Sequence, residues 1–390
     1  MSWDVIGTGA VAGVGGCAPD IFAALCAGTR GLAGLRAFDP ARYRARAAYE
    51  IDDRGRPGRD EPFRATRWLK TAIAQALDEA RLTEDGGTGT GPGGGLPVLI
   101  GTTLREQRTA ELWWTGQAPL RPEDLHFGTA LTGEPGVGPS YTFANACAAS
   151  LCALALGTDL IDLGETDVVV VAGTDSIAES VYGTLDRVQN AVPDALLPFD
   201  ARRRGMLPGE GAAAVVLARP GLYPERARAR LLGVSTNCDA RHPTAPTPRS
   251  IAAAIRDAHR RAGVAPGDID LVMLHGTGTP LNDVSEAKAL GEVFAAPDAR
   301  PLMTAIKAVT GHTLGGSGLL SLVMAMLALE HGTVPPIAGL TDPIEEAAGL
   351  DLVAGAPRRS PLSTAQIDAF GFGGINAVAV LGAREAGAAA

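Results

Sequence analysis

Two stretches without Asp, Glu, Lys or Arg constrain the fold of this chain most strongly. They cover residues 146–158 and 308–329, and their apolar spacing is typical of helices. A helix that is apolar on all sides has to be covered on all sides by other structure. Each stretch also begins near a reactive side chain, Cys147 in the first and His312 in the second. This repetition indicates two similar halves with a buried central helix each, although two unrelated core helices would give the same pattern.

The rest of the chain alternates between short apolar runs and helix-period segments. Continuous apolar runs predict buried strands at 98–101, 167–171, 213–217, 269–274 and 377–381. Segments with charges on one face predict helices at 66–80, 250–262 and 284–294. Strands that alternate with helices indicate an α/β fold built in layers. We expect a flexible loop at 84–95 and a frayed tail from Arg384.

The charge balance excludes several classes of partner. The formal net charge is −9, so no overall basic field is present to bind nucleic acid or an anionic membrane. Glycines interrupt residues 308–329, and the N-terminus lacks a secretory signal, so we expect a cytoplasmic protein without a membrane span. The five cysteines form no CxxC pair, and no histidine has zinc-site spacing, so no metal site is expected.

Cys147 is the strongest candidate nucleophile. It lies among small uncharged residues where a helix should begin, and the N–H groups of a helix start favour the thiolate. His275 and His312 lie in glycine-rich segments far along the chain, and a cysteine with distant histidines suits acyl transfer. A buried structural cysteine and two core histidines are the alternative interpretation.

Two other catalytic motifs are incomplete. Glycines 7, 9 and 13 miss the dinucleotide-binding pattern by one position. The glycine-rich segment 315–319 lacks the final glycine of a serine-hydrolase turn. We therefore expect neither a nicotinamide cofactor nor a serine nucleophile.

Five motifs occur in one order along the chain. They are Asn-Ala-Cys-Ala-Ala-Ser at 145–150, Pro-Phe-Asp-Ala-Arg-Arg-Arg-Gly at 198–205, His-Gly-Thr-Gly-Thr-Pro-Leu-Asn-Asp at 275–283, Lys-Ala-Val-Thr-Gly-His at 307–312 and Phe-Gly-Phe-Gly-Gly-Ile-Asn at 370–376. In this order they closely resemble the β-ketoacyl-acyl carrier protein synthases. The resemblance implies a thiolase fold, a duplicated five-layer αβαβα arrangement with an N-terminal half at 1–225 and a C-terminal half at 226–390.

The resemblance also implies an activity. In such enzymes Cys147 would take an acyl group from an acyl carrier protein or coenzyme A, and His275 and His312 would stabilise the enolate that forms when a malonyl thioester loses carbon dioxide. The product would be a 3-oxoacyl thioester two carbons longer. No resident cofactor is implied, because the phosphopantetheine arm belongs to the acyl carrier protein.

The remaining site residues follow from the same resemblance. They are Lys307 as a catalytic residue; the backbone N–H groups of Cys147 and Phe372 as the oxyanion hole; Thr277, Thr279, Met206, Phe370 and Phe372 for pantetheine or substrate; Asp283, Glu286 and Asn376 as structural support; and Arg56, Arg59, Arg64 and Arg67 for docking of the carrier protein.

The chain departs from the family in three places. Residues 319–322 contain no acid where many members carry a glutamate that pairs with the lysine, which leaves Asp283 and Glu286 as candidate partners for Lys307. Met206 stands where the family commonly has phenylalanine, and Asp368 with Ala369 stand where it has Asn-Ser. These changes indicate a specialised acyl substrate, as in polyketide biosynthesis.

The sequence also fits two other functions on the same fold. A non-decarboxylating acyltransferase would use the same cysteine, whereas a non-catalytic subunit resembling a chain-length factor would not need it. Retention of Cys147, His275 and His312 favours the condensing enzyme. We expect a dimer, of identical chains rather than with a homologous subunit, because Cys147 and both histidines are retained. The resemblance implies that the strand at 167–171 and the helix after Cys147 lie at the centre of its interface, although this apolar run also fits an internal buried strand.

Overall fold

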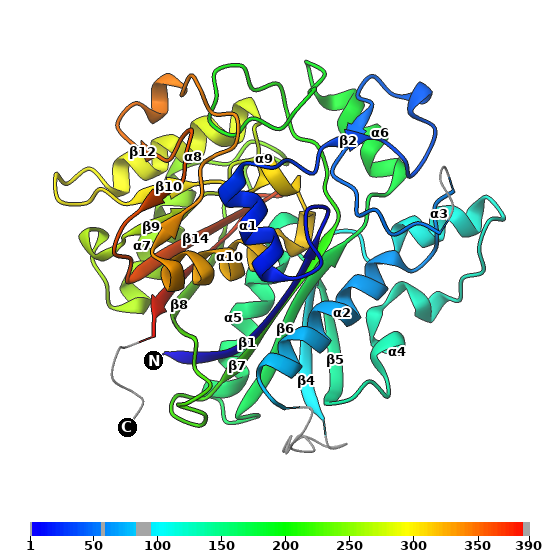
Figure 1. Cartoon of the computed structure of the whole chain (residues 1–390), viewed down its shortest axis with the longest axis horizontal. Coiled ribbons are helices and arrows are strands. Elements are labelled where there is room, and N and C mark those ends of the chain that lie inside the picture. The colour runs from blue at the N-terminus through cyan, green and yellow to red at the C-terminus, as the bar shows by residue number, and fades with distance from the viewer. Residues whose placement is uncertain (1, 56–58, 83–94, 385–390) are drawn as a thin grey trace.

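The computed structural model describes residues 2–55, 59–82 and 95–384 (Figure 1). Its main sheet has the strand order β12-β10-β9-β14-β15-β8-β1-β7-β6-β4-β5. The bounds of these strands are β1 Trp3–Ala12, β4 Leu96–Thr102, β5 Val137–Ala144, β6 Val168–Asp175, β7 Gly211–Ala218, β8 Ala229–Cys238, β9 Leu271–Met273, β10 Leu302–Thr304, β12 Asp351–Leu352, β14 Thr364–Gly371 and β15 Ile375–Ala383. Two small ribbons pair β2 (Ala33–Gly34) with β3 (Ala47–Ala48) and β11 (Thr333–Val334) with β13 (Arg358–Arg359).

The helices fill the connections between these strands. They are α1 Ala18–Ala27, α2 Arg64–Glu79, α3 Gln107–Trp114, α4 Phe127–Leu131, α5 Ala149–Asp162, α6 Glu179–Val188, α7 Pro248–Ala262, α8 Pro280–Val293, α9 Lys307–Thr310 and α10 Ser317–His331. Short 3₁₀ helices, η3 (Ala146–Ala148) and η5 (Leu314–Gly316), lead into α5 and α10. The reactive residues of the sequence therefore lie at the entrances to two long helices.

Strand pairing follows the same pattern on both sides of the contact between β1 and β8. Along β1-β7-β6-β4-β5 the four pairings are antiparallel, antiparallel, parallel and parallel. Along β8-β15-β14-β9-β10 they repeat in that order. This repetition agrees with two similar halves, while the division at residues 225 and 226 stays a prediction.

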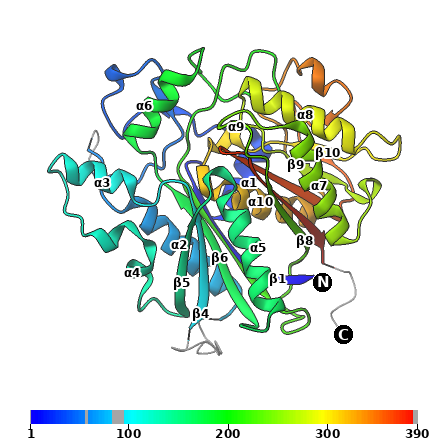
Figure 2. The same ribbon diagram turned by 180° about the vertical axis from the view of Figure 1, so that it is seen from behind.

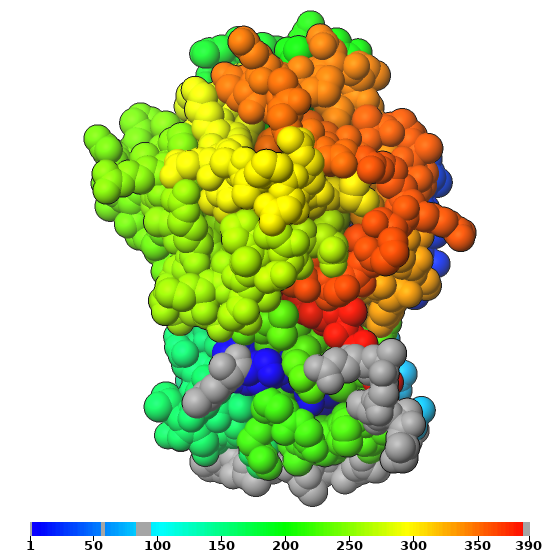
Figure 3. Space-filling view, turned by 90° about the vertical axis from the view of Figure 1, so that its left-hand side faces the viewer, coloured from blue at the N-terminus to red at the C-terminus, as the bar shows by residue number. Residues whose placement is uncertain are grey.

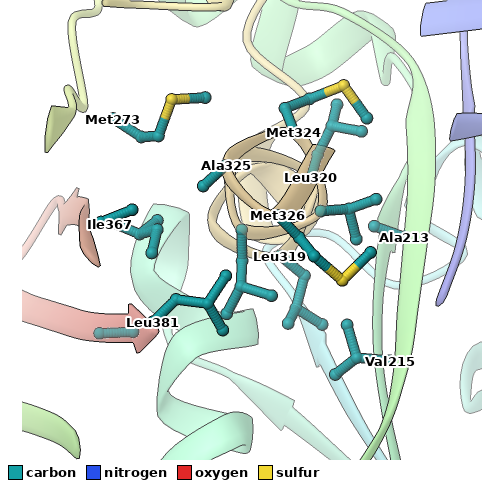
Figure 4. Close-up of a cluster of buried hydrophobic side chains, with 14 of the residues drawn as sticks. Ala213, Val215, Met273, Leu319, Leu320, Met324, Ala325, Met326, Ile367 and Leu381 are labelled. Atoms are coloured by element: carbon teal, nitrogen blue, oxygen red, sulfur yellow. The ribbon is translucent and has the colours of Figure 1, made fainter. Parts of the chain in front are cut away.

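Five layers result from the packing of the helices. The helix α2 covers the outer face of β1, β6 and β7, and α7 covers β8 and β15 with α8 beside it. The helices α5 and α10 lie between the two halves of the sheet (Figures 1 and 2). Figure 4 shows α10 end on. The side chains of Ala213 and Val215 from β7 lie on one side of it, and those of Ile367 from β14 and Leu381 from β15 lie on the other. The five-layer thiolase-type arrangement expected from the resemblance is therefore present.

The apolar character of α10 is explained by this position. Residues Leu314–His331 are long and apolar enough to cross a membrane by length and composition alone, yet 89% of that window is buried inside the protein. In Figure 3 the upper part of the visible side consists mainly of residues of the C-terminal half, coloured yellow-green to orange. The segment Leu314–His331 is thus a core helix of a layered fold.

The elements predicted from the sequence are largely present. All five predicted strands and all three predicted helices occur, with shifts of a few residues at their ends. The glycine-rich segment 7–13, rejected as a cofactor motif, belongs mostly to β1, a strand buried along its whole length. Most of the predicted loop at 84–95 and all but the first residue of the predicted tail lie outside the described residues.

One predicted position is wrong. The strand at 167–171 was expected at the centre of an interface with a second chain, but β6 lies inside the sheet between β4 and β7 and is buried along its whole length. A strand with partners on both sides has no backbone groups left for another chain. The strand at this end of the sheet is β5 instead.

Candidate active site

Cys147 lies in the short turn η3 between β5 and α5, and 5% of its surface is exposed. The preceding residue, Ala146, has φ 50°, a left-handed conformation that costs energy for a residue with a side chain. Close packing holds the start of α5 in place, because a Cβ at Gly101 of β4 would lie 2.3 Å from the nitrogen of Ser150. The thiol is thus presented from a rigid, tightly turned backbone.

The two histidines meet the cysteine in one buried space. The Nε2 atom of His312 lies 3.1 Å from Cys147 Sγ. The rings of His275 and His312 are 5.5 Å apart at 83°, and His275 also contacts the ring of Phe370 at 5.6 Å. His275 follows β9, and His312 follows Gly311, whose φ of 70° turns the chain into the site. The structure therefore brings together the three residues that the sequence singled out.

Burial keeps the nucleophile protonated at rest. Burial raises the pKa of Cys147 to about 11, and the nearby Lys307 and the N–H groups of Phe372 and Cys147 offset only part of this effect. The thiolate expected from the helix start alone is therefore wrong for the resting site. The same two N–H groups are directed at the sulfur, and they would also face an oxyanion formed at a thioester on it.

Both histidines are neutral for the same reason. Burial lowers the pKa of His275 and of His312 well below its usual value, and the charge of Lys307 lowers both further. Lys307 Nζ donates a hydrogen bond to the backbone oxygen of His275 and lies 3.5 Å from Nδ1 of that ring. Lys307 thus contacts the histidine and acts on the cysteine only through its charge.

The two acids proposed as partners of Lys307 hold the His275 loop. Glu286 accepts the backbone N–H groups of His275 at 2.6 Å and of Gly276 at 2.9 Å. Asp283 accepts the N–H of Gly278 in the same loop at 3.2 Å and that of Phe199 at 2.8 Å. Burial lowers the pKa of Lys307 to about 8, and Glu286 is the charge that opposes this most strongly. Glu286 and Asp283 are therefore both support for the loop and part of the charge balance of Lys307.

A small cavity opens in front of the cysteine. Its volume is about 30 Å³. The residues predicted to bind substrate all lie around it, namely Thr277, Thr279, Met206, Phe370 and Phe372. The hydroxyl oxygens of Thr277 and Thr279 are 2.9 Å apart, and Phe372 is 43% exposed.

Asn376 supports the wall of this cavity. It is fully buried on β15, and its amide donates to the backbone oxygen of Gly374 and to the side chains of Asn237 and Ser250. These contacts tie the turn that follows Phe372 to β8 and α7. The position fits the structural support predicted for Asn376.

A loop missed by the sequence analysis covers the cavity. Residues 242–246 line it, and Pro243 accepts the N–H of Gly373 at 2.8 Å. The nitrogen Nδ1 of His242 accepts the N–H groups of Thr244 and Ala245. The only sequence signal is a histidine among prolines directly after the strand β8, which also describes an ordinary surface loop.

Asp175 at the end of β6 was also missed. Its carboxylate accepts four hydrogen bonds at 2.7–2.8 Å, from the hydroxyl of Thr102 and from the N–H groups of Thr103, Leu104 and Gly315. These donors come from both halves of the chain, and Gly315 follows His312 by three residues. Asp175 therefore fixes the His312 loop against the first half of the molecule, and burial raises its pKa to about 6.

The docking role predicted for Arg64 is wrong, because its side chain is only 2% exposed. Arg64 pairs with Glu210 at 2.8 Å, with Asp53 at 2.7 Å and with Asp60 at 3.3 Å, and its guanidinium stacks over Trp68. An arginine held by three carboxylates inside the protein cannot contact another protein. Its function is to fix the segment before α2 against the start of β7.

The other predicted docking arginines have different positions. Arg56 lies outside the described residues, and Arg59 is exposed. Arg67 is exposed on α2 and pairs with Glu61 at 3.1 Å. A groove of about 380 Å³ beside it is lined by Arg67, Lys70 and Arg121, with one acid, Asp124. Basic side chains are thus present near the predicted place, but each is paired with an acid: Arg67 with Glu61, Lys70 with Glu134 and Arg121 with Asp124. Within 2–55, 59–82 and 95–384, no cluster of three or more His, Cys, Asp or Glu side chains could hold a metal ion.

Family models match both halves of the chain. The model described as "Beta-ketoacyl synthase, N-terminal domain" matches residues 136–220, and the one described as "Beta-ketoacyl synthase, C-terminal domain" matches residues 228–341. The first match includes Cys147, and the second includes both histidines.

Full-length relatives and a solved structure agree with these matches. The tetracenomycin polyketide synthase ketoacyl synthase beta subunit of Streptomyces glaucescens is 33% identical over 97% of each chain. The 3-oxoacyl-[acyl-carrier-protein] synthase 2 of Coxiella burnetii is 28% identical over 97% of each chain. The solved ishigamide ketosynthase/chain length factor is 30% identical, with a TM-score of 0.86 over 98% of this chain and 99% of that one.

Proposed function

Because the chain belongs to the β-ketoacyl synthase family, we propose that it joins a Cys147-bound acyl group to a malonyl unit carried on an acyl carrier protein. The observation that carries this proposal is the buried contact of 3.1 Å between Cys147 Sγ and His312 Nε2, with His275 beside it. The relatives named for polyketide and 3-oxoacyl synthesis support the substrate class. The enzyme is an acyltransferase of the 3-oxoacyl-[acyl-carrier-protein] synthase type.

The first step loads the cysteine. Cys147 Sγ attacks the thioester carbonyl carbon as its proton passes to His312 Nε2, and the carrier thiol leaves with that proton. The N–H groups of Cys147 and Phe372 stabilise the negative oxygen of the tetrahedral intermediate. Because the resting thiol has a pKa of about 11, the thiolate forms only as the carbonyl is attacked.

The second step makes the carbon–carbon bond. The bond between the malonyl carboxylate and its α-carbon breaks, carbon dioxide leaves, and the electron pair forms an enolate. The neutral imidazole of His275 suits this enolate as a hydrogen-bond donor, because Lys307 close to its Nδ1 favours the tautomer with hydrogen on Nε2. His312 gave its proton to the carrier thiol in the first step, so it donates to the enolate only after its ring hydrogen has moved from Nδ1 to Nε2. The α-carbon then attacks the Cys147 thioester, and the released thiolate takes up one proton.

The two alternatives are less well supported. A non-catalytic partner subunit does not need a cysteine with two hydrogen-bond donors at its sulfur. A transferase without decarboxylation does not need a second histidine beside the first. The arrangement of Cys147, His275 and His312 therefore favours condensation.

Intact-mass analysis with a panel of acyl and malonyl thioesters tests the function directly. A mass increase on Cys147, followed by loss of that acyl group together with release of carbon dioxide and formation of a 3-oxoacyl thioester, is expected. Loading without carbon dioxide release from any malonyl thioester would identify a simple acyltransferase. No loading from any thioester would leave the non-catalytic role.

We place the carrier protein at the groove lined by Arg67, Lys70 and Arg121. Carrier proteins are acidic, and this chain carries a net charge of −9, so docking needs a local basic surface. The phosphopantetheine arm arrives with the carrier, and Thr277 and Thr279 at the cavity would hold it.

We place a second subunit against β5 and the outer side of α5. This end of the sheet leaves one edge of β5 without a neighbouring strand among the described residues, and Tyr141 on β5 is 54% exposed. Leu156 on α5 and Leu163 directly after it are exposed, and α5 contacts β5 (Figure 2). The similarity to a solved ketosynthase/chain length factor favours a homologous subunit as the partner, and a second identical chain is the other possible outcome.

Sedimentation equilibrium of the purified chain tests this assembly. Tyr141→Asp should weaken the dimer, whereas Trp114→Asp, at an 82% exposed position on α3, is the matched control that should leave it intact. An active monomer of the unmodified chain would contradict the interface. Association only after co-expression with a homologue would identify a heterodimer.

A further inference from the structure

Asp368 is a buried acid that neither the loading step nor the condensation step uses. It lies on β14, and it is 1% exposed. The parallel register of β14 with β9 pairs Ile367 with Met273, which places Asp368 level with Leu274 and next to His275. Its strand neighbours two positions away, Gln366 and Phe370, are on the same face, and Phe370 contacts the His275 ring. Asp368 therefore faces the layer of α7 and α8 directly behind the catalytic histidine.

A chain of hydrogen bonds fixes the orientation of Asp368. The amide of Gln366 donates from Nε2 to both carboxyl oxygens, at 2.9 and 3.0 Å, and its oxygen lies 2.7 Å from Nε2 of the buried His259 on α7. Since burial lowers the pKa of His259, its neutral ring donates Nε2–H to Gln366. The Gln366 amide is thereby held with its NH₂ group toward Asp368.

Asp368 has fewer donors than the other two buried acids near Lys307. Glu286 accepts two backbone N–H groups and the amide of Asn282. Asp283 accepts N–H groups of Phe199 and Gly278 and the same amide, and the Arg203 guanidinium lies 3.9 Å from it. Among the described residues, the donor bonded to Asp368 is the single nitrogen of Gln366. Asp368 is therefore the least stabilised of the three as an anion.

The charges in this space do not balance if all three acids are ionised. Lys307 and Arg203 supply two positive charges against three carboxylates, and an unmatched charge in a fully buried space is costly. The titratable groups that act on Asp368 or lie in the elements packed around it are His259 of α7, Asp283 and Glu286 of α8, Lys307 of α9, His275 after β9 and Cys147 of η3. Two ionised carboxylates balance the charges of Lys307 and Arg203. The third carboxyl group therefore has to keep its proton.

We infer that Asp368 carries this proton and is a positioning residue: as a neutral acid it leaves Lys307 and Glu286 as a matched pair beside His275 while the negative enolate develops. Ionised Asp368 would add a second anion behind the histidine that stabilises the enolate. The electrostatic effect of Glu286 on Asp368 acts in the same direction, since it favours the protonated form. The part of the inference that concerns the enolate rests on the proposed function. The protonation state of Asp368 does not depend on it.

Infrared difference spectroscopy tests the protonation state without any substrate. The carbonyl band of un-ionised carboxylic acids should be present near pH 7 in the wild-type protein and weaker in Asp368→Asn, which lacks the acid group of Asp368. Asp186→Asn is the matched control, because Asp186 is also buried, but the N–H groups of Ala45 and Arg44 lower its pKa, so its removal should leave the band unchanged. An unchanged acid band in Asp368→Asn would overturn the inference.

The pH dependence of carbon dioxide release tests the positioning role. Asp368→Asn keeps the shape and the neutral charge, so release near pH 7 should stay within about threefold of wild type while the alkaline decline moves to higher pH. An unchanged alkaline decline, or a loss of release at all pH values, would overturn the role. If no malonyl thioester is a substrate, the proposed function fails while the infrared band still decides the protonation state.

A second variant serves if Asp368→Asn does not fold. Gln366→Met removes the donor bonded to Asp368, so the acid band should persist to higher pH than in the wild type. If the acid band of Gln366→Met disappeared at a lower pH than that of the wild type, the inference would be contradicted. A wild-type protein without an acid band near pH 7 would also contradict it.

Discussion

Cys147 Sγ and His312 Nε2 lie 3.1 Å apart, although 165 positions separate the two residues in the sequence. Both residues are buried, and burial keeps both groups neutral at rest. The pair is therefore a thiol and an imidazole, unlike the thiolate and imidazolium of many cysteine enzymes. The thiol of Cys147 therefore becomes reactive only when a thioester carbonyl binds at the two N–H groups next to the sulfur.

Cys147→Ala should abolish acyl loading, because it removes the nucleophile. Intact-mass analysis after incubation with an acyl thioester measures this. Cys238→Ala is the control, since Cys238 is exposed and lies on β8, and it should load as the wild type does. Acyl transfer to another residue in Cys147→Ala would mean that the nucleophile has been misassigned.

His275→Ala should separate the two steps. His275 does not contact the sulfur, so loading should remain measurable, whereas carbon dioxide release should fall by about 10²–10³-fold, the usual effect of losing one donor to an oxyanion. His312→Ala should reduce both steps, because His312 lies next to Cys147. Equal loss of loading in the two variants would show that His275 also acts before decarboxylation.

Charge reversal at two neighbouring arginines of α2 should have different effects. Arg67→Glu should raise the KM for a carrier-bound substrate and leave the KM for a short thioester mimic unchanged. Arg64→Glu places an acid among three carboxylates inside the protein and should lower the free energy of unfolding by about 3–5 kcal/mol or prevent folding. Thermal unfolding and steady-state kinetics measure the two effects. A change in KM for both substrates in Arg67→Glu would exclude the docking role.

Asp175 should make the protein less stable as the pH rises from about 4 to about 6. Burial raises its pKa from 3.8 in the unfolded chain to about 6, so its contribution is fully present below the lower value and lost above the higher one. Urea unfolding at several pH values should show a shallower decline in Asp175→Asn than in the wild type. Equal slopes in the two proteins would mean that the four hydrogen bonds to Asp175 cancel the effect of burial.

The catalytic residues could be predicted from the sequence because each one interrupts a local pattern. Cys147 and His312 begin apolar stretches, and His275 ends an apolar run and enters a glycine-rich loop. Such positions are local properties of the chain. The five layers were implied by the family resemblance, whereas the apolar helices by themselves indicated only that two helices are buried.

The charges of individual groups could not be predicted in this way. Arg64 looks like a surface residue in its own helix, and it is buried because Glu210, 146 positions away, meets it from the start of β7. The pKa of Cys147 depends on how completely other layers cover it. Likewise, the end strand β5 and the internal strand β6 are distinguished only by which strands pair beside them.

The position of β1 has a consequence for biosynthesis. This strand leaves the ribosome well before its partners β7 and β8, which begin at Gly211 and Ala229. At about 5–20 residues per second, about 200 residues and some 10–40 s of translation separate β1 from its first partner. During that time a mostly apolar strand has unpaired edges, a state prone to aggregation. Folding of the nascent chain should therefore depend on chaperones that bind extended apolar segments, and faster translation of residues 13–210 should raise the soluble yield.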